Sequence, residues 1–129
     1  MNKKLITGIC AGLIIVIVLA FMLPHPTFDK SNPILFEKQT NGEYAYIIYQ
    51  DREYVPYCAF NPHERGKYLG FVGDDRADEI YTFKGHSEAE WLISYLNSGL
   101  MNDCMLLKEK NVTEIPEGLS SEYEWNQLP

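Results

Sequence analysis

A long apolar run opens the chain and sets its first part apart from the rest of the sequence. Residues 5–23 carry no charge, and Lys3 and Lys4 stand directly before them. As a helix at 1.5 Å per residue, a run of this length would extend about 28 Å, close to the hydrocarbon thickness of a bilayer. The run also lacks the small-x-small ending of a cleavable leader. The pattern therefore predicts a retained transmembrane signal-anchor over residues 5–23.

Two alternatives to the retained anchor stay open. The run could be cut off as a secretory leader. It could also be lipidated at Cys10, although Cys10 follows Ile9 and lies inside the run rather than at its end. If the run is retained, the two lysines on its short side predict a single-pass protein of the cell membrane, with residues 1–4 cytoplasmic and the remainder extracytoplasmic.

After the predicted anchor, the pattern changes to a proline-rich stretch and then to short alternating runs. Residues 24–33 contain three prolines and are interpreted as a stalk, and residues 34–129 are enough for one domain with one core. Two β-rich runs, 34–40 and 43–50, flank Asn41-Gly42. Asn-Gly is the strongest short hairpin signal because both turn residues must take positive φ.

The next runs predict further strands. Residues 53–60 contain Pro56, which lacks a ladder donor and therefore predicts an edge strand or a bulged strand. Residues 68–72 and 79–84, joined by the acidic loop 73–78, predict a second hairpin.

One segment follows a helical pattern. Ser87-x-x-Glu90 has the spacing of a capping box, and Gly99 is a natural helix stop. Between them, apolar side chains recur at helical spacing, which predicts a helix packed against the sheet through Trp91, Leu92, Tyr95 and Leu96.

Three short elements complete the predicted domain. Residues 104–108 could be a last strand, 115–118 a turn, and 121–126 a short edge strand or a clamp over the core. The expected fold class is α+β: a small antiparallel β-meander or partly open barrel of about five or six strands with one packed helix.

Composition narrows the range of partners. The 106 residues after the predicted anchor hold all 18 acidic residues and 9 of the 11 basic ones, a net charge of −9. Such an acidic domain argues against nucleic acid and against tight contact with anionic lipid headgroups. A net negative charge is consistent with high solubility, with binding of a basic partner and with binding of a cation, and it does not distinguish these three roles.

The two cysteines of the domain allow one intramolecular bridge, Cys58–Cys104. The alternative is that both are buried free thiols that pack as small hydrophobic side chains. Both interpretations stay open at this point.

Motifs for catalysis or metal binding do not stand out. The acidic loop around Asp74, Asp75 and Asp78 could offer carboxylates to Ca²⁺, but it lacks the ligand spacing of the helix–loop–helix calcium motif, and a solvated loop is the simpler interpretation. His63 and His86 have no second histidine nearby, and no Gly-x-Ser-x-Gly is present. The sequence therefore predicts no enzyme activity, no cofactor and no metal site.

Tyrosine is abundant in this chain, and its side chains are the main candidates for binding a partner. Five of the nine tyrosines fall on two neighbouring predicted strands, and a small sheet buries only one face well. Exposed tyrosines suit recognition of a partner, whereas the alternative is ordinary cross-strand aromatic pairing. The candidate partner-binding residues are Tyr44, Tyr46, Tyr49, Tyr54 and Tyr57, together with the acidic-loop residues Asp74, Asp75 and Asp78.

One stretch resembles a group of proteins with no assigned activity. Tyr68-Leu69-Gly70-Phe71-Val72-Gly73, followed by Ile80-Tyr81-Thr82-Phe83-Lys84-Gly85-His86-Ser87-Glu88-Ala89-Glu90-Trp91, resembles small membrane-anchored exported proteins of Gram-positive bacteria. In those proteins a Leu-Gly hairpin leads into an aromatic strand, a Lys-Gly turn and a capped helix. The resemblance implies fold and location, and carries over no catalytic residue.

These observations favour a membrane-tethered extracytoplasmic binding module of the cell envelope. It would bind a protein or cell-wall partner through the tyrosine-bearing sheet and the acidic loop. Two other classes stay open: an immunity-type protein that binds a basic toxin or enzyme, and a small cofactor-free hydrolase.

Overall fold

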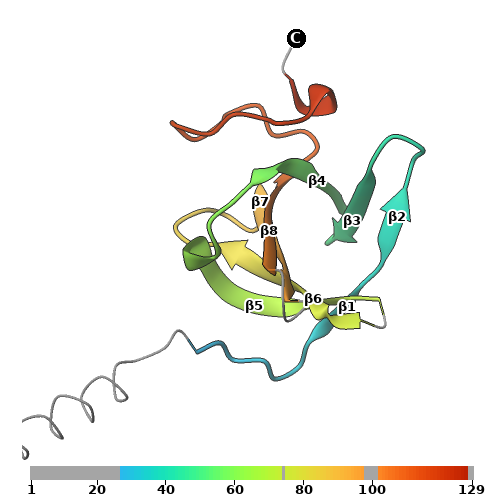
Figure 1. Cartoon of the computed structure of the whole chain (residues 1–129), viewed down its shortest axis with the longest axis vertical. Helices are drawn as coiled ribbons and strands as arrows, with labels where there is room; N and C mark the ends of the chain where they lie inside the picture. Colours follow the sequence, from blue (N-terminus) through green and yellow to red (C-terminus); the bar gives the residue numbers. More distant parts are fainter. Residues whose placement is uncertain (1–26, 74, 98–101, 128–129) are drawn as a thin grey trace, which may run out of the picture.

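The computed structural model describes residues 27–73, 75–97 and 102–127, which form eight β-strands and two three-residue 3-10 turns (Figure 1). The strands are β1 (Ile34–Phe36), β2 (Lys38–Thr40), β3 (Ala45–Tyr49), β4 (Arg52–Ala59), β5 (Arg65–Val72), β6 (Asp75–Phe83), β7 (Trp91–Asn97) and β8 (Asn102–Glu109). The turns are η1 (Pro62–Glu64) and η2 (Glu124–Asn126).

All eight strands belong to one sheet that curls into a nearly closed barrel. Their order is β1-β5-β6-β7-β8-β4-β3-β2, and every neighbouring pair is antiparallel except β1 and β5. Strands β1 and β2 are separated only by Glu37, yet they lie at opposite ends of this order. The short segment that holds both strands therefore bridges the two edges of the sheet, as Figure 1 shows.

Side chains of alternating strand positions form two separate cores. The core inside the barrel contains Phe36, Ile47, Tyr49, Tyr54, Leu69, Val72, Ile80, Leu92 and Leu107. The core on the outer face contains Tyr57, Cys58, Tyr68, Tyr81, Phe83, Trp91, Ile93 and Leu106. Phe28 from the N-terminal side and Ile115 and Leu119 from the C-terminal side pack against this outer core. Because terminal segments cover it, the sheet buries apolar side chains on both faces.

The predicted α+β class is wrong, because the segment predicted as a helix is the central strand β7. Trp91, Leu92 and Ile93 are consecutive and no more than 1% exposed, so they fill both faces of the sheet. A continuous buried run of this kind is typical of a strand covered on both sides. A helix would have placed Ile93 away from the predicted apolar stripe.

The capping-box residues form one turn and no helix. The Ala89 amide donates to the Ser87 hydroxyl, 3.1 Å away, and the amides of Glu90 and Trp91 both donate to the Ser87 carbonyl oxygen. The chain then enters β7 at Trp91. The Ser87 hydroxyl therefore accepts from the Ala89 amide and not from that of Glu90, which a capping box would require. The burial of Trp91, Leu92 and Ile93 makes the next segment a strand.

Most of the predicted strands are confirmed, but the predicted run 34–40 is two strands, β1 and β2, and two further details differ. β2 and β3 form the first hairpin, but its loop spans residues 41–44, and Gly42 takes a φ of +88° while Asn41 accepts hydrogen bonds from two amides. β4 contains Pro56 and has a register shift between Pro56 and Cys58. It is therefore the bulged strand, and the part that holds Pro56 is also at an edge, since pairing with β3 ends at Tyr54 whereas pairing with β8 continues to Ala59.

The predicted single-pass membrane placement is corrected as well. Residues 5–23, which carry that prediction, lie outside the described residues, and no helix in the described part of the chain is long and apolar enough to cross a membrane. The anchor, the cytoplasmic N-terminus and the extracytoplasmic location are therefore not proposed for this protein.

Candidate functional site

One end of the barrel opens into a pocket, which we call the barrel mouth. Its volume is about 160 Å³, similar to that of an apolar cavity that accepts benzene. Seven of the eight strands contribute to its wall, through Lys38, Ala45, Tyr46, Ile47, Tyr54, Pro56, Val72, Asp78, Ile80, Ser94, Met105 and Leu107. Barrel mouths are a common place for small-ligand sites.

The strand register explains how a polar group comes to line this pocket. Ile80 of β6 lies opposite Ser94 of β7, and Ser94 lies opposite Met105 of β8. Asp78 is two residues before Ile80 and therefore faces the same side of the sheet. The apolar floor and the polar wall of the mouth thus come from inward-facing side chains of the same three neighbouring strands.

The Asp78 carboxylate is the fixed polar group of the mouth. The Ser94 hydroxyl donates a hydrogen bond to Asp78 Oδ1 over 2.9 Å. Lys38 Nζ lies 3.9 Å from Asp78 Oδ2, but the Lys38 side chain is 56% exposed whereas that of Asp78 is 16% exposed. The carboxylate is therefore held in the wall, and the ammonium lies at its solvent edge.

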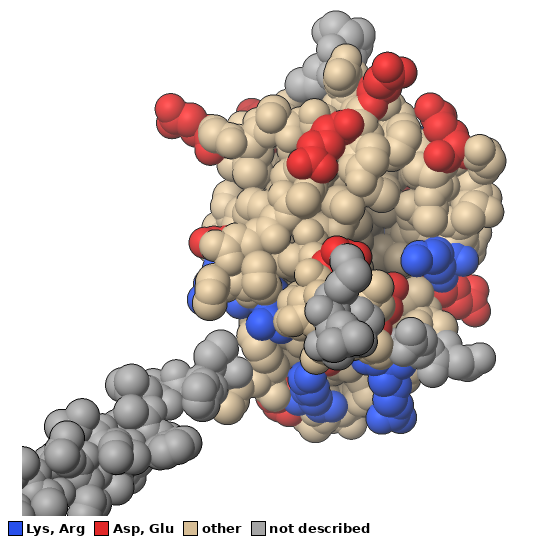
Figure 2. Space-filling view, in the orientation of Figure 1, with Lys and Arg blue, Asp and Glu red and all other residues tan. Residues whose placement is uncertain are grey.

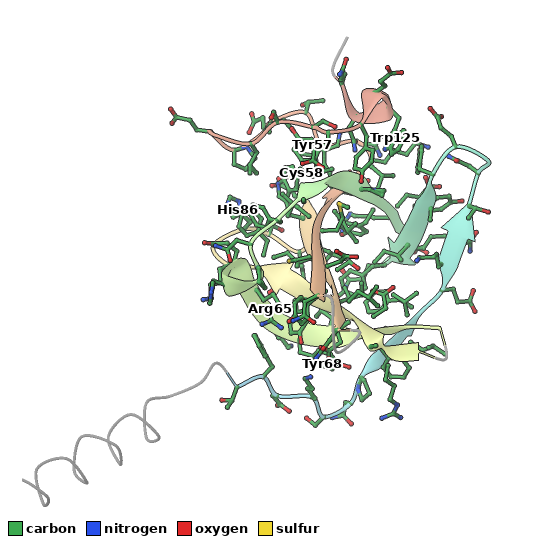
Figure 3. The ribbon with its side chains drawn as sticks, viewed as in Figure 1. Tyr57, Cys58, Arg65, Tyr68, His86 and Trp125 are labelled. Carbon is green, nitrogen blue, oxygen red and sulfur yellow. The ribbon has the colours of Figure 1, made fainter. Side chains whose placement is uncertain are left out.

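A cluster of aromatic rings lies beside β3, and Tyr46 connects it to the mouth. Trp125 of η2 stacks between Tyr44 and Tyr123, with ring centroids 4.8 Å and 4.6 Å away. Tyr46 packs edge-on against Tyr44 and also lines the mouth. The indole nitrogen of Trp125 is buried and has no hydrogen-bond partner among the described residues. Figure 3 shows Trp125 between η2 and β4.

Two tyrosines close the other end of the barrel. The Tyr54 hydroxyl donates to the Glu88 carbonyl oxygen over 2.5 Å, and the Tyr49 hydroxyl donates to Glu88 Oε1 over 3.3 Å. Burial raises the pKa of Tyr54 to about 12 and also raises that of Tyr49. Both phenols are therefore neutral donors at physiological pH and contribute to the barrel interior.

The structure separates the five candidate tyrosines into two groups. Tyr49, Tyr54 and Tyr57 are at most 9% exposed and belong to the cores. Only Tyr44 and Tyr46 are partly exposed; Tyr46 lines the mouth, and Tyr44 packs against Tyr46. A partner could therefore meet two of the five rings.

The acidic-loop candidates are also divided. Asp74 lies outside the described residues, Asp75 begins β6, and Asp78 lines the mouth. Within the described ranges, no three acidic, histidine or cysteine residues are grouped so that they could hold a metal ion. The Ca²⁺ interpretation of this loop is therefore not pursued.

The two cysteines are free thiols in the outer core. Cys58 is buried in β4 opposite Leu106, and Cys104 is partly buried in β8 opposite Tyr95. Burial raises the pKa of Cys58 and raises that of Cys104 to about 11. Both are therefore protonated at neutral pH and pack as small apolar groups.

Sequence reasoning missed the two polar partners of Asp78 in the mouth, Ser94 and Lys38. In the predicted helix Ser94 lies outside the apolar stripe, and Lys38 is only one residue of a predicted strand. Strand alternation through Leu92, Ser94 and Leu96 was the available signal for Ser94, but it depends on recognising β7 as a strand. Comparison of the chain with protein-family models, with curated proteins and with solved structures finds no match.

Proposed function

We propose that this protein is a non-enzymatic binding domain whose site is the barrel mouth. The proposal rests on one observation: a pocket lined by seven strands combines an apolar floor with a single fixed carboxylate, that of Asp78. A pocket that is mostly apolar with a few convergent polar groups is the usual form of a small-ligand site.

The ligand class follows from the polar group. Asp78 can accept hydrogen bonds, and its counterion Lys38 is solvent-exposed and 3.9 Å away, so a ligand cation can replace it. Ile80, Met105 and Leu107 provide the apolar surface beneath. The overall charge of −7 also attracts cations. We therefore expect a small ligand with an apolar body and an ammonium or similar donor head.

A titration of the ¹⁵N-labelled full chain with benzylamine, and separately with benzoate, tests this proposal. Both probes carry a benzene ring, which matches the volume of the mouth, and they differ in the sign of their charge. We expect benzylamine to shift the amide signals of Ile80, Ser94 and Met105, and benzoate to shift them far less. Asp78→Asn should weaken benzylamine binding by about tenfold, because a charge-assisted hydrogen bond is lost.

A pair of alanine variants provides the matched control. Ala45 lines the mouth and Ala59 is exposed on β4 away from it. Ala45→Phe fills the mouth and should abolish the benzylamine shifts, whereas Ala59→Phe should leave them unchanged. The proposal fails if neither probe causes saturable shifts at the mouth, or if the two alanine variants behave alike.

A second candidate function is binding of a basic protein, which the C-terminal segment favours. Residues 111–127 contain no Lys or Arg, and their four glutamates, Glu114, Glu117, Glu122 and Glu124, are all exposed. Figure 2 shows acidic side chains over this part of the surface. Salt-sensitive binding to a basic protein, lost in a variant with these four residues changed to Gln but retained in Ala45→Phe, would favour this candidate over the mouth.

A further inference from the structure

A second pocket, at the opposite end of the barrel wall from the mouth, is lined by basic side chains. Its volume is about 330 Å³, and its lining includes His63, Arg65 and Lys84, together with Thr27 and Phe28 of the N-terminal segment. Among the described residues, no carboxylate lines it, although the chain has 18 acidic residues and 11 basic ones. We call it the oxyanion pocket, after the kind of ligand that a basic lining suits.

A β-bulge places Arg65 on this side of the sheet. Arg65 pairs with Phe83 and Tyr68 pairs with Tyr81, so three steps along β5 match two steps along β6. Without the extra residue, Arg65 and Tyr68 would face opposite sides of the sheet. With it, both reach Tyr81 on the outer face: the guanidinium lies 4.9 Å from that ring, and the Tyr68 and Tyr81 rings lie 5.4 Å apart. Bulges commonly re-aim a side chain in this way.

The Arg65 guanidinium is held by rings and one backbone acceptor. It lies 4.1 Å from the Tyr95 ring and 4.8 Å from the Phe28 ring, and its Nε donates to the Pro62 carbonyl oxygen over 2.8 Å. Among the ion pairs of the described residues, none joins Arg65 to a carboxylate. The structure therefore keeps a partly buried cation in a fixed position without an acidic counterion.

The η1 turn and Lys84 complete a preorganised set of donors. The Asn61 side chain accepts from the His63 amide over 2.9 Å and thereby fixes the turn. Lys84 Nζ donates to the His63 carbonyl oxygen over 3.0 Å, and the Lys84 amide donates to the Glu64 carbonyl oxygen. Although Glu64 belongs to the same turn, its side chain does not line the pocket. Figure 3 shows Arg65 beside this turn, at the start of β5.

We propose that the oxyanion pocket binds a phosphoryl group. A guanidinium presents paired N–H donors that match phosphate oxygens, and an ammonium contributes a point charge and further donors. A phosphoryl group offers three oxygens to the three basic residues, whereas a carboxylate offers only two. The charge of phosphate also matches Arg65 and Lys84 together better than that of a monoanion.

The test is a titration of the ¹⁵N-labelled full chain with inorganic phosphate, and separately with acetate, at constant ionic strength. We expect phosphate to cause saturable shifts at the amides of His63, Gly66 and Lys84, and acetate to bind much more weakly. Lys84→Gln should weaken phosphate binding by about tenfold or more, because one charge-assisted contact is lost. Arg65→Lys, which keeps the charge and loses the planar fork, should weaken it by a similar factor.

Lys67→Gln is the matched control for Lys84→Gln. Lys67 is exposed and lies on β5 with Arg65, but it does not line the oxyanion pocket. It removes the same charge and should change the affinity less than twofold, as expected for a screened surface charge. The proposal is overturned if phosphate causes no saturable shifts, if acetate binds as well as phosphate, or if Lys67→Gln has the same effect as Lys84→Gln.

A third titration with phenyl phosphate distinguishes the source of the phosphoryl group. Tighter binding than inorganic phosphate, with added shifts at Phe28, supports the proposal and assigns an organic phosphate ester. If phenyl phosphate shifts the same amides but binds more weakly than inorganic phosphate, the result supports the proposal and assigns the free ion as the ligand. Phenyl phosphate shifts at the barrel mouth instead of these amides would contradict it.

Discussion

Two adjacent residues hold the turn between β3 and β4 in a conformation that their side chains disfavour. Gln50 and Asp51 have φ values of 51° and 61°, and Tyr49 pairs with Arg52 across them. A two-residue loop with positive φ at both positions is the type I′ hairpin turn, which favours Asn-Gly. The sequence contains Asn-Gly at a different hairpin, where a four-residue loop does not need both residues in this conformation.

The double variant Gln50→Asn/Asp51→Gly should therefore stabilise the protein. Relief of the left-handed backbone cost should raise the free energy of unfolding by about 1 kcal/mol, measured by urea denaturation. Gln50→Val is the opposing variant and should lower it, because a β-branched residue is the least suited to positive φ. Equal stability of all three proteins would mean that the turn is not of this type.

Cysteine reactivity is a second consequence at the scale of single residues. Burial raises the pKa of the Cys104 thiol to about 11 from an ordinary value of 9.0, and it raises that of Cys58 in the same direction. A higher pKa means less thiolate at a given pH, and the thiolate is the species that reacts. In a Cys10→Ala background, we expect iodoacetamide at about pH 8 to modify the native protein about 100-fold more slowly than the protein unfolded in guanidinium chloride.

Single-cysteine versions of that background separate the two thiols, with Cys58→Ala reporting on Cys104 and Cys104→Ala reporting on Cys58. Similar rates in the native and unfolded states would contradict the burial of these residues. Absence of any free thiol without reductant would instead show that the bridge between them forms.

At the scale of single elements, β7 decides the fold class. Its apolar residues Trp91, Leu92, Tyr95 and Leu96 fit a helical stripe as well as two faces of a strand, so periodicity alone does not separate the two. Ile93 does separate them, because it is 0% exposed in the sheet and would face away from the stripe of a helix. The β-branched side chain at that position was the signal in favour of a strand.

Ile93→Ala should therefore lower the free energy of unfolding by about 2–5 kcal/mol, as for other buried large-to-small changes. Ile48→Ala is the matched control, because Ile48 is 41% exposed on β3, and its effect should be well below that of Ile93→Ala. Circular dichroism of the wild-type protein should show strand and little helix. Equal effects of the two substitutions in urea denaturation would mean that β7 is not buried on both faces.

The strand pairings that sequence patterns predicted correctly join strands that are consecutive in the chain. The hairpins β2–β3 and β5–β6 carry their turn signals between the two strands. The pairing of β4 with β8 and the parallel pairing of β1 with β5 join distant segments, for which no local pattern exists. The same limit applies to the barrel mouth: Asp78 was a candidate, whereas Ser94 and Lys38 join it only through the closed sheet.

At the scale of the whole molecule, the two proposed sites lie at opposite ends of one strand. Arg65 begins β5 at the oxyanion pocket and Val72 ends it at the barrel mouth. Seven steps of about 3.3 Å separate these residues by about 23 Å. That distance exceeds the Debye length of about 8 Å at physiological salt, so ligands at the two sites should bind independently.

The C-terminal segment completes an edge that the sheet leaves open. The pairing of β3 with β4 ends at Tyr54, and the remainder of β4 pairs only with β8. The Glu122 amide donates to the Tyr57 carbonyl oxygen over 2.9 Å, and the Asn126 side chain donates to the Pro56 carbonyl oxygen. The segment therefore acts as the clamp that was one of its two predicted forms, and it covers an edge that could otherwise pair with another chain.

Removal of residues 121–129 should expose this edge and the outer core beside it. We expect a lower midpoint of thermal unfolding, faster labelling of Cys58 in the single-cysteine background, and concentration-dependent self-association in analytical ultracentrifugation. Asn126→Ala, which removes one edge contact and keeps the segment, should shift the midpoint in the same direction by less and leave the protein monomeric. A truncated protein with unchanged stability and unchanged Cys58 labelling would show that the segment is not part of the folded domain. A truncated protein that is less stable yet does not associate would confine its role to covering Tyr57 and Cys58.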